Sequence, residues 1–545
     1  MSTDPLALDL LMFAALIGCI LIGFPVAFSI AGVAVAFAFL GAATGAMDLS
    51  LLGALGQRVF GVLTNEVLIA IPLFVFMGVV LEKSRLAEEL LESMAGLFGR
   101  LPGGLGVSVV LVGALLAAST GIVGATVIAM GLIALPTMLR SGHDRAFAAG
   151  IVCTAGTLGQ IIPPSTLLII LADVMSNGYQ QAQYAEGKFS VETVSVGEVF
   201  AAALLPGLLL VALYLAYVLG RAALRPQDAP VGLPDAAPAA PGSTSDAATV
   251  SSPDAVPDEG AVPDARRPGA IGAVLPPVAL IVAVLGSILG GVATPTEAAS
   301  IGAVGAILMA GHRQGVPSAL VAGGAAALVA LVVTAGLAPV RLQRSDAGAL
   351  DWTLGALYAA LALGGFVVVL LSLRALARRT VLGPVTTSTM TVTAMIFATI
   401  IAASVFSLVF VGLGGEARVE RLLESMPGGP TGALLFCLAL IFVLGFFLDF
   451  VEITVILLPL IVPGLIAMGH DPIWLTVLIA INLQTSFLTP PFGFSLFYLR
   501  GAAPKEITTG QIYAGVAPFI VLQIAGIALL WWVPAIATWL PAAVF

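Results

Sequence analysis

Charged side chains are scarce in this chain: its 545 residues include 21 Lys and Arg and 30 Asp and Glu, or 9% charged residues in total. Hydrophobic residues make up 59%, and the mean hydropathy is +1.11. Soluble globular domains carry about 25% charged residues, so this composition excludes that class. Apolar runs of the ~20 residues needed to cross a bilayer recur along the whole chain and predict more than ten crossings.

Cysteine and histidine are also sparse, with three residues of each. Cys19, Cys153 and Cys437 lie far apart in apolar stretches without metal-binding or redox spacing, so we expect them to fill the core. The sequence has no G-x-x-x-x-G-K-[ST] phosphate loop, nucleophile elbow, zinc-type cluster or basic patch for nucleic acid. These absences exclude an ATP-driven motor within the chain and argue against an enzyme, a bound cofactor and a nucleic-acid partner.

The net charge of −9 comes mainly from one segment. Residues 226–268 hold seven acidic residues against two arginines and are rich in Pro, Ala, Ser and Asp. Because the segment has few large apolar side chains, burial cannot offset its chain entropy, which predicts a disordered linker. The linker divides the chain into two halves.

The two halves match each other. Both contain an isolated proline, a Gly-His-Asp triplet and a Pro-Pro pair in the same order, 327 residues apart: Pro136, Gly142-His143-Asp144 and Pro163-Pro164 recur as Pro463, Gly469-His470-Asp471 and Pro490-Pro491. Two of the three histidines lie in the repeated triplet, which indicates an internal repeat. About seven crossings separate the Pro-Pro sites, and because this number is odd, we expect the second copy to be inverted, as in many secondary transporters.

Each Pro-Pro pair interrupts an apolar segment. The first site reads GTLGQIIPPS over 156–165, and the second reads QTSFLTPPFG over 484–493. Two consecutive prolines remove two backbone donors and clash with the preceding turn, so the helix must break. Broken backbone is tolerated in hydrocarbon only where protein or a water-filled cavity satisfies the freed carbonyls. We therefore expect both sites to be buried at an interior cavity.

A helix break supplies two kinds of ligand: unwound carbonyls and hydroxyls suit sodium, and half-helix N-termini suit a carboxylate. The candidate binding residues at the breaks are Thr154, Gly156, Thr157, Gly159, Pro163, Pro164, Ser165 and Thr166 in the first half, and Asn482, Gln484, Thr485, Ser486, Thr489, Pro490, Pro491 and Gly493 in the second. The alternative is a packing kink whose hydroxyls bond their own helix. Two matched breaks with polar flanks favour the binding site.

The segment before each Pro-Pro site is also interrupted. Its candidate residues are Ser119, Thr120 and Thr126 in the first half, and Asp449, Glu452 and Thr454 in the second. Intramembrane acids are costly and mark functional positions, so the two carboxylates are candidates for a cation site or a proton carrier. The alternative is that they lie at a helix end facing headgroup water. Farther along, Thr294-Pro295-Thr296-Glu297 predicts a helix start with a capping box.

Several stretches resemble the large membrane subunit of tripartite ATP-independent periplasmic (TRAP) transporters, the DctM-like family. They are GFPVAFSIAG (23–32), IPLFVFMG (71–78), STGIVGATVIAMG (119–131), GTLGQIIPPS, ATPTEAA (293–299) and FLTPPFGFSLFYLRG (487–501). The resemblance covers nearly the whole chain. The two Pro-Pro motifs in this order, with TPTEAA between them, are the specific part.

The resemblance implies an all-α polytopic membrane protein of the ion transporter superfamily type: an inverted repeat with two re-entrant helical hairpins and broken helices, working as a sodium-coupled elevator. It implies a bacterial inner membrane, a small four-helix membrane subunit, a periplasmic substrate-binding protein and contact with membrane lipid. Carried onto this chain, it places the hairpin tips at 156–165 and 485–493 and the helix breaks at 119–126 and 449–454. The sodium ligands are expected among Gly156, Thr157, Thr485 and Ser486.

Family substrates are mostly carboxylates. The STGIVGAT and FVEIT stretches resemble the branch for 2-oxo acids, lactate and related monocarboxylates. The nearest alternative is an ion-coupled anion symporter that needs no binding protein. A channel would favour rings of charge along a continuous path, and an enzyme would need a nucleophile and a base, which the sequence does not supply.

The predicted organisation has nine parts. They are scaffold helices (1–104), a first broken helix and re-entrant hairpin (105–175), a loop and scaffold helix (176–225), the linker (226–268), scaffold helices (269–317), a two-helix insertion (318–376), a scaffold helix with an amphipathic segment (377–430), a second broken helix and hairpin (431–501), and a C-terminal helix (502–545). The linker and the insertion depart from the family pattern.

Overall fold

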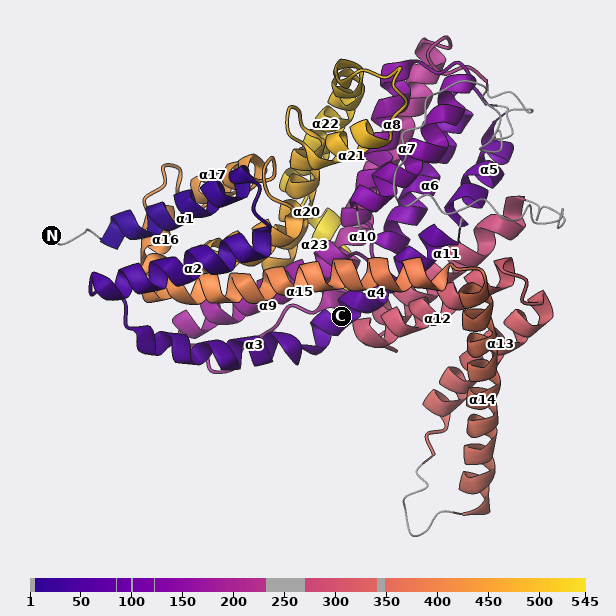
Figure 1. The fold of residues 1–545 in the computed structure, drawn as a ribbon, viewed down its shortest axis with the longest axis horizontal. Coiled ribbons are helices and arrows are strands. Elements are labelled where there is room, and N and C mark those ends of the chain that lie inside the picture. Colours follow the sequence, from indigo (N-terminus) through magenta and orange to yellow (C-terminus); the bar gives the residue numbers. More distant parts are fainter. Residues whose placement is uncertain (1–4, 85, 100, 122, 232–269, 341–347) are drawn as a thin grey trace.

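A computed structural model describes residues 5–84, 86–99, 101–121, 123–231, 270–340 and 348–545 of the chain. All its named elements are helices (Figure 1), as the sequence predicted. From residue 232 onward, the predicted linker at 226–268 lies outside the described residues.

The helices of the first half precede the linker. They are α1 (Pro5–Ile22), α2 (Val26–Ala43), η1 (Leu49–Ala54), α3 (Leu55–Leu63), α4 (Glu66–Lys83), α5 (Leu86–Phe98), α6 (Gly104–Thr120), α7 (Val123–Arg140), α8 (Arg145–Thr157), η2 (Leu158–Gln160), α9 (Thr166–Ala185) and α10 (Val196–Leu224).

The helices of the second half follow the linker. They are α11 (Ala270–Leu289), α12 (Pro295–Arg313), α13 (Ser318–Leu337), α14 (Ala349–Arg378), α15 (Leu382–Gly412), α16 (Gly415–Glu424), α17 (Gly429–Leu444), α18 (Phe450–Glu452), η3 (Ile453–Leu457), α19 (Leu458–Ala467), α20 (Pro472–Leu488), α21 (Phe494–Ala502), α22 (Thr509–Trp532) and α23 (Ala535–Val544). Thr294 and Glu297 form the predicted capping box at the start of α12.

Eight of the described helices are long and apolar enough to cross a membrane, or nine if the bent pair 49–63 and 66–83 counts as one span. The sequence predicted more than ten crossings. The counts differ because proline, glycine and polar residues divide the interrupted segments into shorter pieces. Six further apolar helices of 10–17 residues lie in the described part of the chain.

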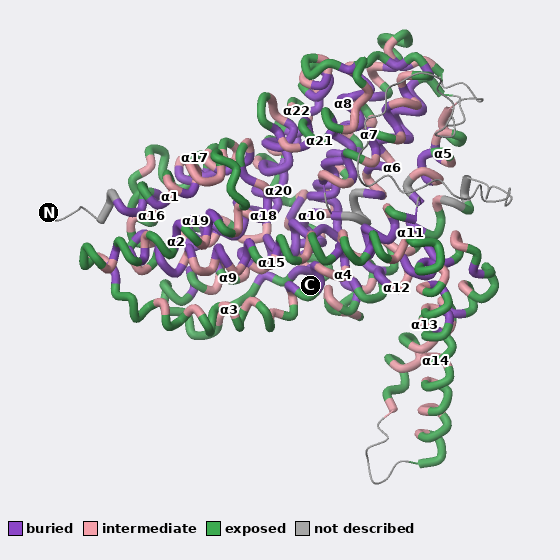
Figure 2. The backbone as a smooth tube through the Cα atoms, in the orientation of Figure 1, coloured by how far each residue is buried: buried purple, intermediate pink, exposed green. Residues whose placement is uncertain are grey.

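Helices α13 and α14 occupy the segment where the sequence predicted two added spans. Gly324 packs against Val368, and the Tyr358 hydroxyl donates to the Thr334 carbonyl at 2.9 Å, so the two helices form a hairpin. The hairpin extends away from the rest of the molecule, and most of its surface is exposed (Figures 1 and 2). Exposed apolar helix sides of this length are suited to contact with lipid.

The two halves share local structure at the repeat offset. Asp144 accepts a hydrogen bond from the backbone N–H of Phe147 at 2.9 Å and caps α8. Asp471 accepts from the N–H of Trp474 at 2.7 Å and caps α20. Both capped helices lead to a Pro-Pro pair. The sequence repeat is therefore a structural repeat as well.

The halves also exchange packing partners. Helix α7 of the first half packs against α21 of the second, and the equivalent α19 packs against α9. Likewise α8 packs on α22 while α20 packs on α10, and α8 contacts α20 directly. Such reciprocal contacts relate the halves by a pseudo-two-fold axis, as expected from the internal repeat.

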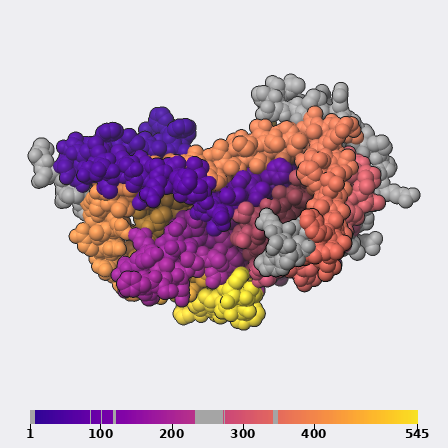
Figure 3. Space-filling model, turned by 90° about the horizontal axis from the view of Figure 1, so that it is seen from below, coloured from indigo at the N-terminus to yellow at the C-terminus, as the bar shows by residue number. Residues whose placement is uncertain are grey.

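Helices from both ends of the chain enclose this centre. α15 runs beside α2, α3 and α4, and α23 packs against α10. Seen from below, the N-terminal helices and α15 lie along one side of the molecule, and the yellow C-terminal helix lies on the other (Figure 3). The exchanged helices are therefore held between scaffold elements that are distant in sequence.

Two glycines set the crossing of α8 and α22. A Cβ atom at Gly150 would collide with the Gly515 carbonyl, and one at Gly515 would collide with the Ala146 carbonyl. Small residues let helices approach closely in a membrane, where packing rather than water exclusion drives association.

We expect Gly150→Ala to lower the thermal unfolding temperature in detergent. Alanine favours an isolated helix by about 1 kcal/mol over glycine, but the backbone clash reverses the sign here. Gly220→Ala on α10 is the control, because a Cβ there meets nothing within 4 Å. If Gly150→Ala were as stable as the control, the close crossing would be wrong.

Candidate functional site

The helical hairpins lie at other positions than the sequence predicted. α6 and α7 pack against each other on either side of Gly121, and α17 packs on α19 across the turn at 445–449. In contrast, α8 packs on α6, α7 and α22, whereas α9 on the far side of the first Pro-Pro pair packs on α19 and α4. In the first half, the predicted assignment of the hairpin tip to 156–165 and of the helix break to 119–126 is therefore reversed. In the second half, α21 packs more extensively on α7 than on α20, so the assignment of 485–493 and 449–454 is reversed in the same way.

The reversal has a simple physical reason. A Pro-Pro pair removes hydrogen bonds from a helix, but it does not by itself turn the chain back. Gly121 has a φ of +61°, a backbone conformation that glycine adopts without a steric cost. The chain folds back there, and the Pro-Pro pairs interrupt the segments that follow each hairpin.

The first break is wholly enclosed. All residues from 151 to 172 are buried. Ser165 occupies the N-cap position of α9, but its hydroxyl donates to the Gln160 carbonyl at 2.9 Å and does not cap the helix. The first N–H groups of a 20-residue helix thus have no side-chain cap, and its positive end is free to face an anion.

The second break is more open. Pro490 is half-buried, while Pro491 and Phe492 are exposed, so the prediction of full burial is wrong for these outer residues. The Tyr513 hydroxyl donates to the Pro491 carbonyl at 2.9 Å, which satisfies one freed carbonyl from within the protein. Gly493 precedes α21 and offers no capping side chain. A second uncapped helix start therefore lies at this break.

The helices leading into the two breaks meet at one polar contact. The Gln484 side-chain amide donates to the Thr157 hydroxyl at 3.3 Å, and both side chains are buried. These residues are 327 positions apart, which is the repeat offset. Equivalent positions of two related halves touch only near the axis that relates them. The pseudo-two-fold axis therefore passes beside this pair.

The two hairpin turns lie against the breaks. A Cβ at Gly121 would come within 2.9 Å of the Thr166 hydroxyl and 3.1 Å of its backbone nitrogen. A Cβ at Gly445 would come within 2.8 Å of the Ser486 Cβ. The structure thus brings four interruptions together, two hairpin turns and two helix breaks.

The side chains of several predicted residues donate hydrogen bonds to nearby helix carbonyls. This is what the alternative interpretation, a packing kink, predicts. The hydroxyls of Thr157, Thr485, Ser486 and Thr489 donate to carbonyls of their own segments, and the Asn482 amide donates to the Leu438 carbonyl at 2.8 Å. Each hydroxyl oxygen still has lone pairs with which to accept a hydrogen bond or bind a cation. Thr126 is buried on α7, and the side chains of Ser119 and Thr120 lie outside the described part.

Other buried polar atoms around the breaks have no hydrogen-bond partner in the described part of the chain. They are Thr154 Oγ1, Gln160 Oε1 and Nε2, Thr166 Oγ1, Thr454 Oγ1 and Gln484 Oε1. Leaving such a group unpaired costs about 1–3 kcal/mol, so a concentration of them points to a ligand or water. Gln160 was missed as a site residue, although it is the single amide within GTLGQIIPPS.

Asp449 and Glu452 begin the short helix α18. Glu452 accepts a hydrogen bond from the Asp449 backbone N–H at 3.0 Å, and Asp449 accepts from the Phe450 N–H at 2.8 Å. Both acids therefore lie at a helix end, as the alternative interpretation predicted. Their role in binding a cation or carrying a proton stays a prediction.

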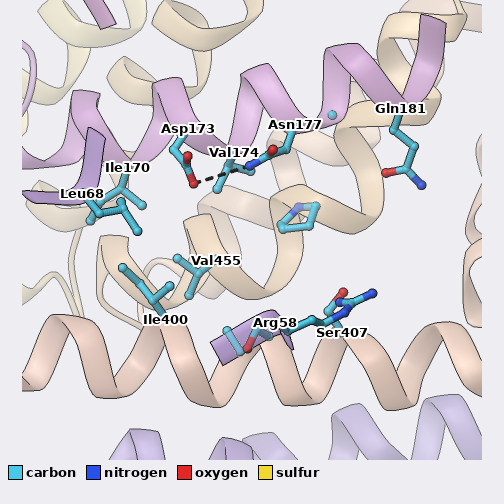
Figure 4. Close-up of a pocket in the computed structure, with 14 residues that line it drawn as sticks. Arg58, Leu68, Ile170, Asp173, Val174, Asn177, Gln181, Ile400, Ser407 and Val455 are labelled. Atoms are coloured by element: carbon cyan, nitrogen blue, oxygen red, sulfur yellow. Dashed lines mark hydrogen bonds between the residues drawn. The ribbon is translucent and has the colours of Figure 1, made fainter. Parts of the chain in front are cut away.

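A polar cavity beside α9 was not foreseen. It has a volume of about 220 Å³, and its polar lining residues are Arg58, Asp173, Asn177, Gln181, Ser404 and Ser407. Arg58 on α3 lies across the cavity from Asp173 and Asn177 on α9 (Figure 4). An adjoining cavity of about 200 Å³ shares Arg58, Gln181 and Ser407. The lining side chains come from segments far apart in sequence; the one local signal is an arginine within the apolar stretch 51–63.

Chemical cross-linking tests whether the helices before the breaks meet. With Cys19, Cys153 and Cys437 replaced by alanine, Thr157→Cys combined with Gln484→Cys should cross-link within one chain through a short bifunctional thiol reagent, because the native side chains are in contact. Protease cleavage in the 232–269 segment followed by electrophoresis would show whether the halves stay joined.

The matched control combines Thr157→Cys with Gly220→Cys, since residue 220 has open space around it. Equal cross-linking of both pairs, or none in the first, would refute the contact between the halves.

Comparisons with known proteins agree with this architecture. The sequence profile of the tripartite ATP-independent periplasmic transporter, DctM component, matches residues 13–337 and 313–536. The C4-dicarboxylate TRAP transporter large permease protein DctM of Vibrio cholerae is 26% identical, with 97% of each chain covered. The ectoine TRAP transporter large permease protein TeaC of Halomonas elongata is 24% identical and covers 97% of this chain and 98% of its own.

The crystal structure of the YdaH transporter of Alcanivorax borkumensis has a similar fold. Its TM-score is 0.51 at 17% identity, and the match covers 91% of this chain and 89% of that one. The profile match, which spans most of the sequence, agrees with the membrane-spanning helices and the repeated breaks. The chain is a multi-pass membrane permease and belongs to the DctM family of TRAP transporter large subunits.

Proposed function

We propose that the chain carries out sodium-coupled secondary uptake of organic-acid anions as the large membrane subunit of a TRAP transporter. The main observation that supports this proposal is the set of buried polar atoms without hydrogen-bond partners around the pseudo-two-fold axis. They lie next to the uncapped start of α9. In this proposal the chain lies in a bacterial inner membrane. It works with a small four-helix membrane subunit and receives substrate from a periplasmic binding protein.

The substrate is a carboxylate in this proposal. The N-terminus of a helix binds anions through free N–H groups and its dipole, and α9 and α21 both start without a side-chain cap. Thr166 is the first residue of α9, and Gln160 and Gln484 lie on the segments that lead into the two breaks; their unpartnered hydroxyl and amide groups would supply hydrogen bonds. C4-dicarboxylates and ectoine, for which two relatives are named, both contain a carboxylate group. We propose 2-oxo acids and lactate-like monocarboxylates as the first substrates to test.

Sodium is the coupling ion in this proposal. Hard cations prefer oxygen ligands, and interrupted helices offer backbone carbonyls and hydroxyls. The residues suited to hold sodium are Gly156 and Thr157 in the first half, and Thr485 and Ser486 in the second. In the described residues, no three His, Cys, Asp or Glu groups gather as they would around a transition metal.

An elevator motion suits the arrangement of the helices. The two hairpins and the two broken segments pack on one another across the halves, whereas α1 to α4 and α15 form a separate layer beside them. The cavity at Arg58 lies between α3 and α15 on one side and α9 and η3 on the other. We propose that the hairpins are re-entrant, that they move with the bound ligands, and that this polar cavity lies at the boundary between the moving and fixed parts.

Uptake into proteoliposomes tests the coupling. The chain, reconstituted with its small membrane subunit and supplied with its binding protein, should accumulate labelled lactate, 2-oxo acids or dicarboxylates only with an inward sodium gradient. Equal accumulation without that gradient would overturn sodium coupling. Unchanged uptake after omission of the binding protein would favour the independent symporter.

Replacing Gln160 by leucine separates binding from folding. The amide is fully buried and unpartnered, so an apolar side chain of similar size should leave the unfolding temperature unchanged or raise it. Sodium-driven uptake should fall by about tenfold or more, because that is the effect expected from losing one hydrogen bond to a charged ligand.

Gln523→Leu is the matched control. Gln523 is equally buried, but it lies on α22 beside the Tyr214 hydroxyl, outside the two breaks. This variant should keep wild-type uptake. Uptake that stayed normal in Gln160→Leu would exclude this amide from the binding site.

A further inference from the structure

A basic cavity lies where the α13–α14 hairpin joins α12. Its volume is about 510 Å³. The lining residues that matter here are Gln314, Gly315, Leu320, Arg374, Arg378 and Arg379. The cavity lies apart from the helix breaks and from the cavity at Arg58, and the proposed transport cycle makes no use of it.

Within the described residues, no acidic side chain pairs with the three arginines. Arg374, Arg378 and Arg379 lie within six residues at the end of α14. Arg374 and Arg378 are one helical turn apart, so like charges face each other on one side of the helix. Three guanidinium groups around one cavity therefore favour an anion, and planar guanidinium groups match phosphate oxygens well.

The start of α13 adds to this positive potential. The helix begins at Ser318, and the preceding Pro317 supplies no side-chain cap. Pro317 and Leu320 line the cavity, so the first turn of a 20-residue helix faces it. Its free N–H groups and the positive end of its dipole act together with the arginines.

The surroundings of the cavity are apolar and exposed. Leu320 and Leu371 line it and are 47% and 42% exposed. In the most apolar 18-residue stretches of α13 and α14, only 6% and 11% of the residues, respectively, are buried. At 1.5 Å per residue, the 30-residue α14 is about 45 Å long and exceeds the ~30 Å hydrocarbon core. Its arginine end is therefore suited to the headgroup level.

We propose that this cavity binds an anionic phospholipid. The phosphate lies among Arg374, Arg378, Arg379 and the start of α13, and the acyl chains run along the exposed sides of the hairpin. A soluble anion would account for the arginines but not for the apolar rim. Because Gly311 of α12 packs on Ser372 of α14 next to the cavity, a bound lipid would brace the hairpin against the scaffold.

Native mass spectrometry of the purified full chain tests the site. We expect phosphatidylglycerol or cardiolipin, but not phosphatidylcholine, to remain bound and to raise the unfolding temperature. The triple variant Arg374→Gln, Arg378→Gln, Arg379→Gln should lose affinity by roughly fivefold for each arginine removed, the weight of one basic residue at an anionic membrane surface.

The matched control changes the same number of charges elsewhere. The triple variant Arg140→Gln, Arg225→Gln, Arg421→Gln should bind anionic lipid as the wild type does, since none of these residues lines the cavity. Equal lipid binding by both triple variants would overturn the proposal. Stabilisation of the wild type by inorganic phosphate alone, or equal retention of phosphatidylcholine, would also overturn it.

Discussion

In a membrane, each backbone N–H and C=O group must find a partner inside the protein, because hydrocarbon offers none. This constraint governs the centre of the molecule. Two helices are interrupted by Pro-Pro pairs, and two hairpins turn at glycine-containing segments, so the chain creates unpaired backbone groups at four places. The fold gathers these four places together.

Close packing of small residues makes this gathering possible. Because Gly121 has no side chain, the start of α9 packs directly against the first hairpin turn. In the same way, Gly445 lets Ser486 pack against the second turn. Gly150 and Gly515 let α8 and α22 touch backbone to backbone. Since apolar burial drives little association within lipid, such contacts must come from shape, and a single methyl group is enough to disturb them.

Charge in this chain is rare and grouped. Free hydrogen-bonding groups and unpaired charge occur at different places in the described chain. Uncapped helix starts and neutral side chains lie at the breaks, and arginines without an acidic partner lie at the end of α14. In the proposed function, neutral ligands would allow the carried ion and anion to be released again, because binding by dipoles is weaker than binding by full opposite charges. Arginines suit a lipid that stays in place.

The sequence by itself determined the class of the molecule, the repeat at an offset of 327 residues and the positions of both helix interruptions, because composition, proline chemistry and capping act locally. The capping of α12 by Thr294 and Glu297 was predicted in the same way. Tertiary structure alone decided which segments fold back, because a proline pair stops a helix without setting the direction of the chain. It also decided that Thr157 meets Gln484, that the buried Gln160 amide has no partner in the described chain and that Arg58 lines a polar cavity, since such surroundings depend on how distant helices pack.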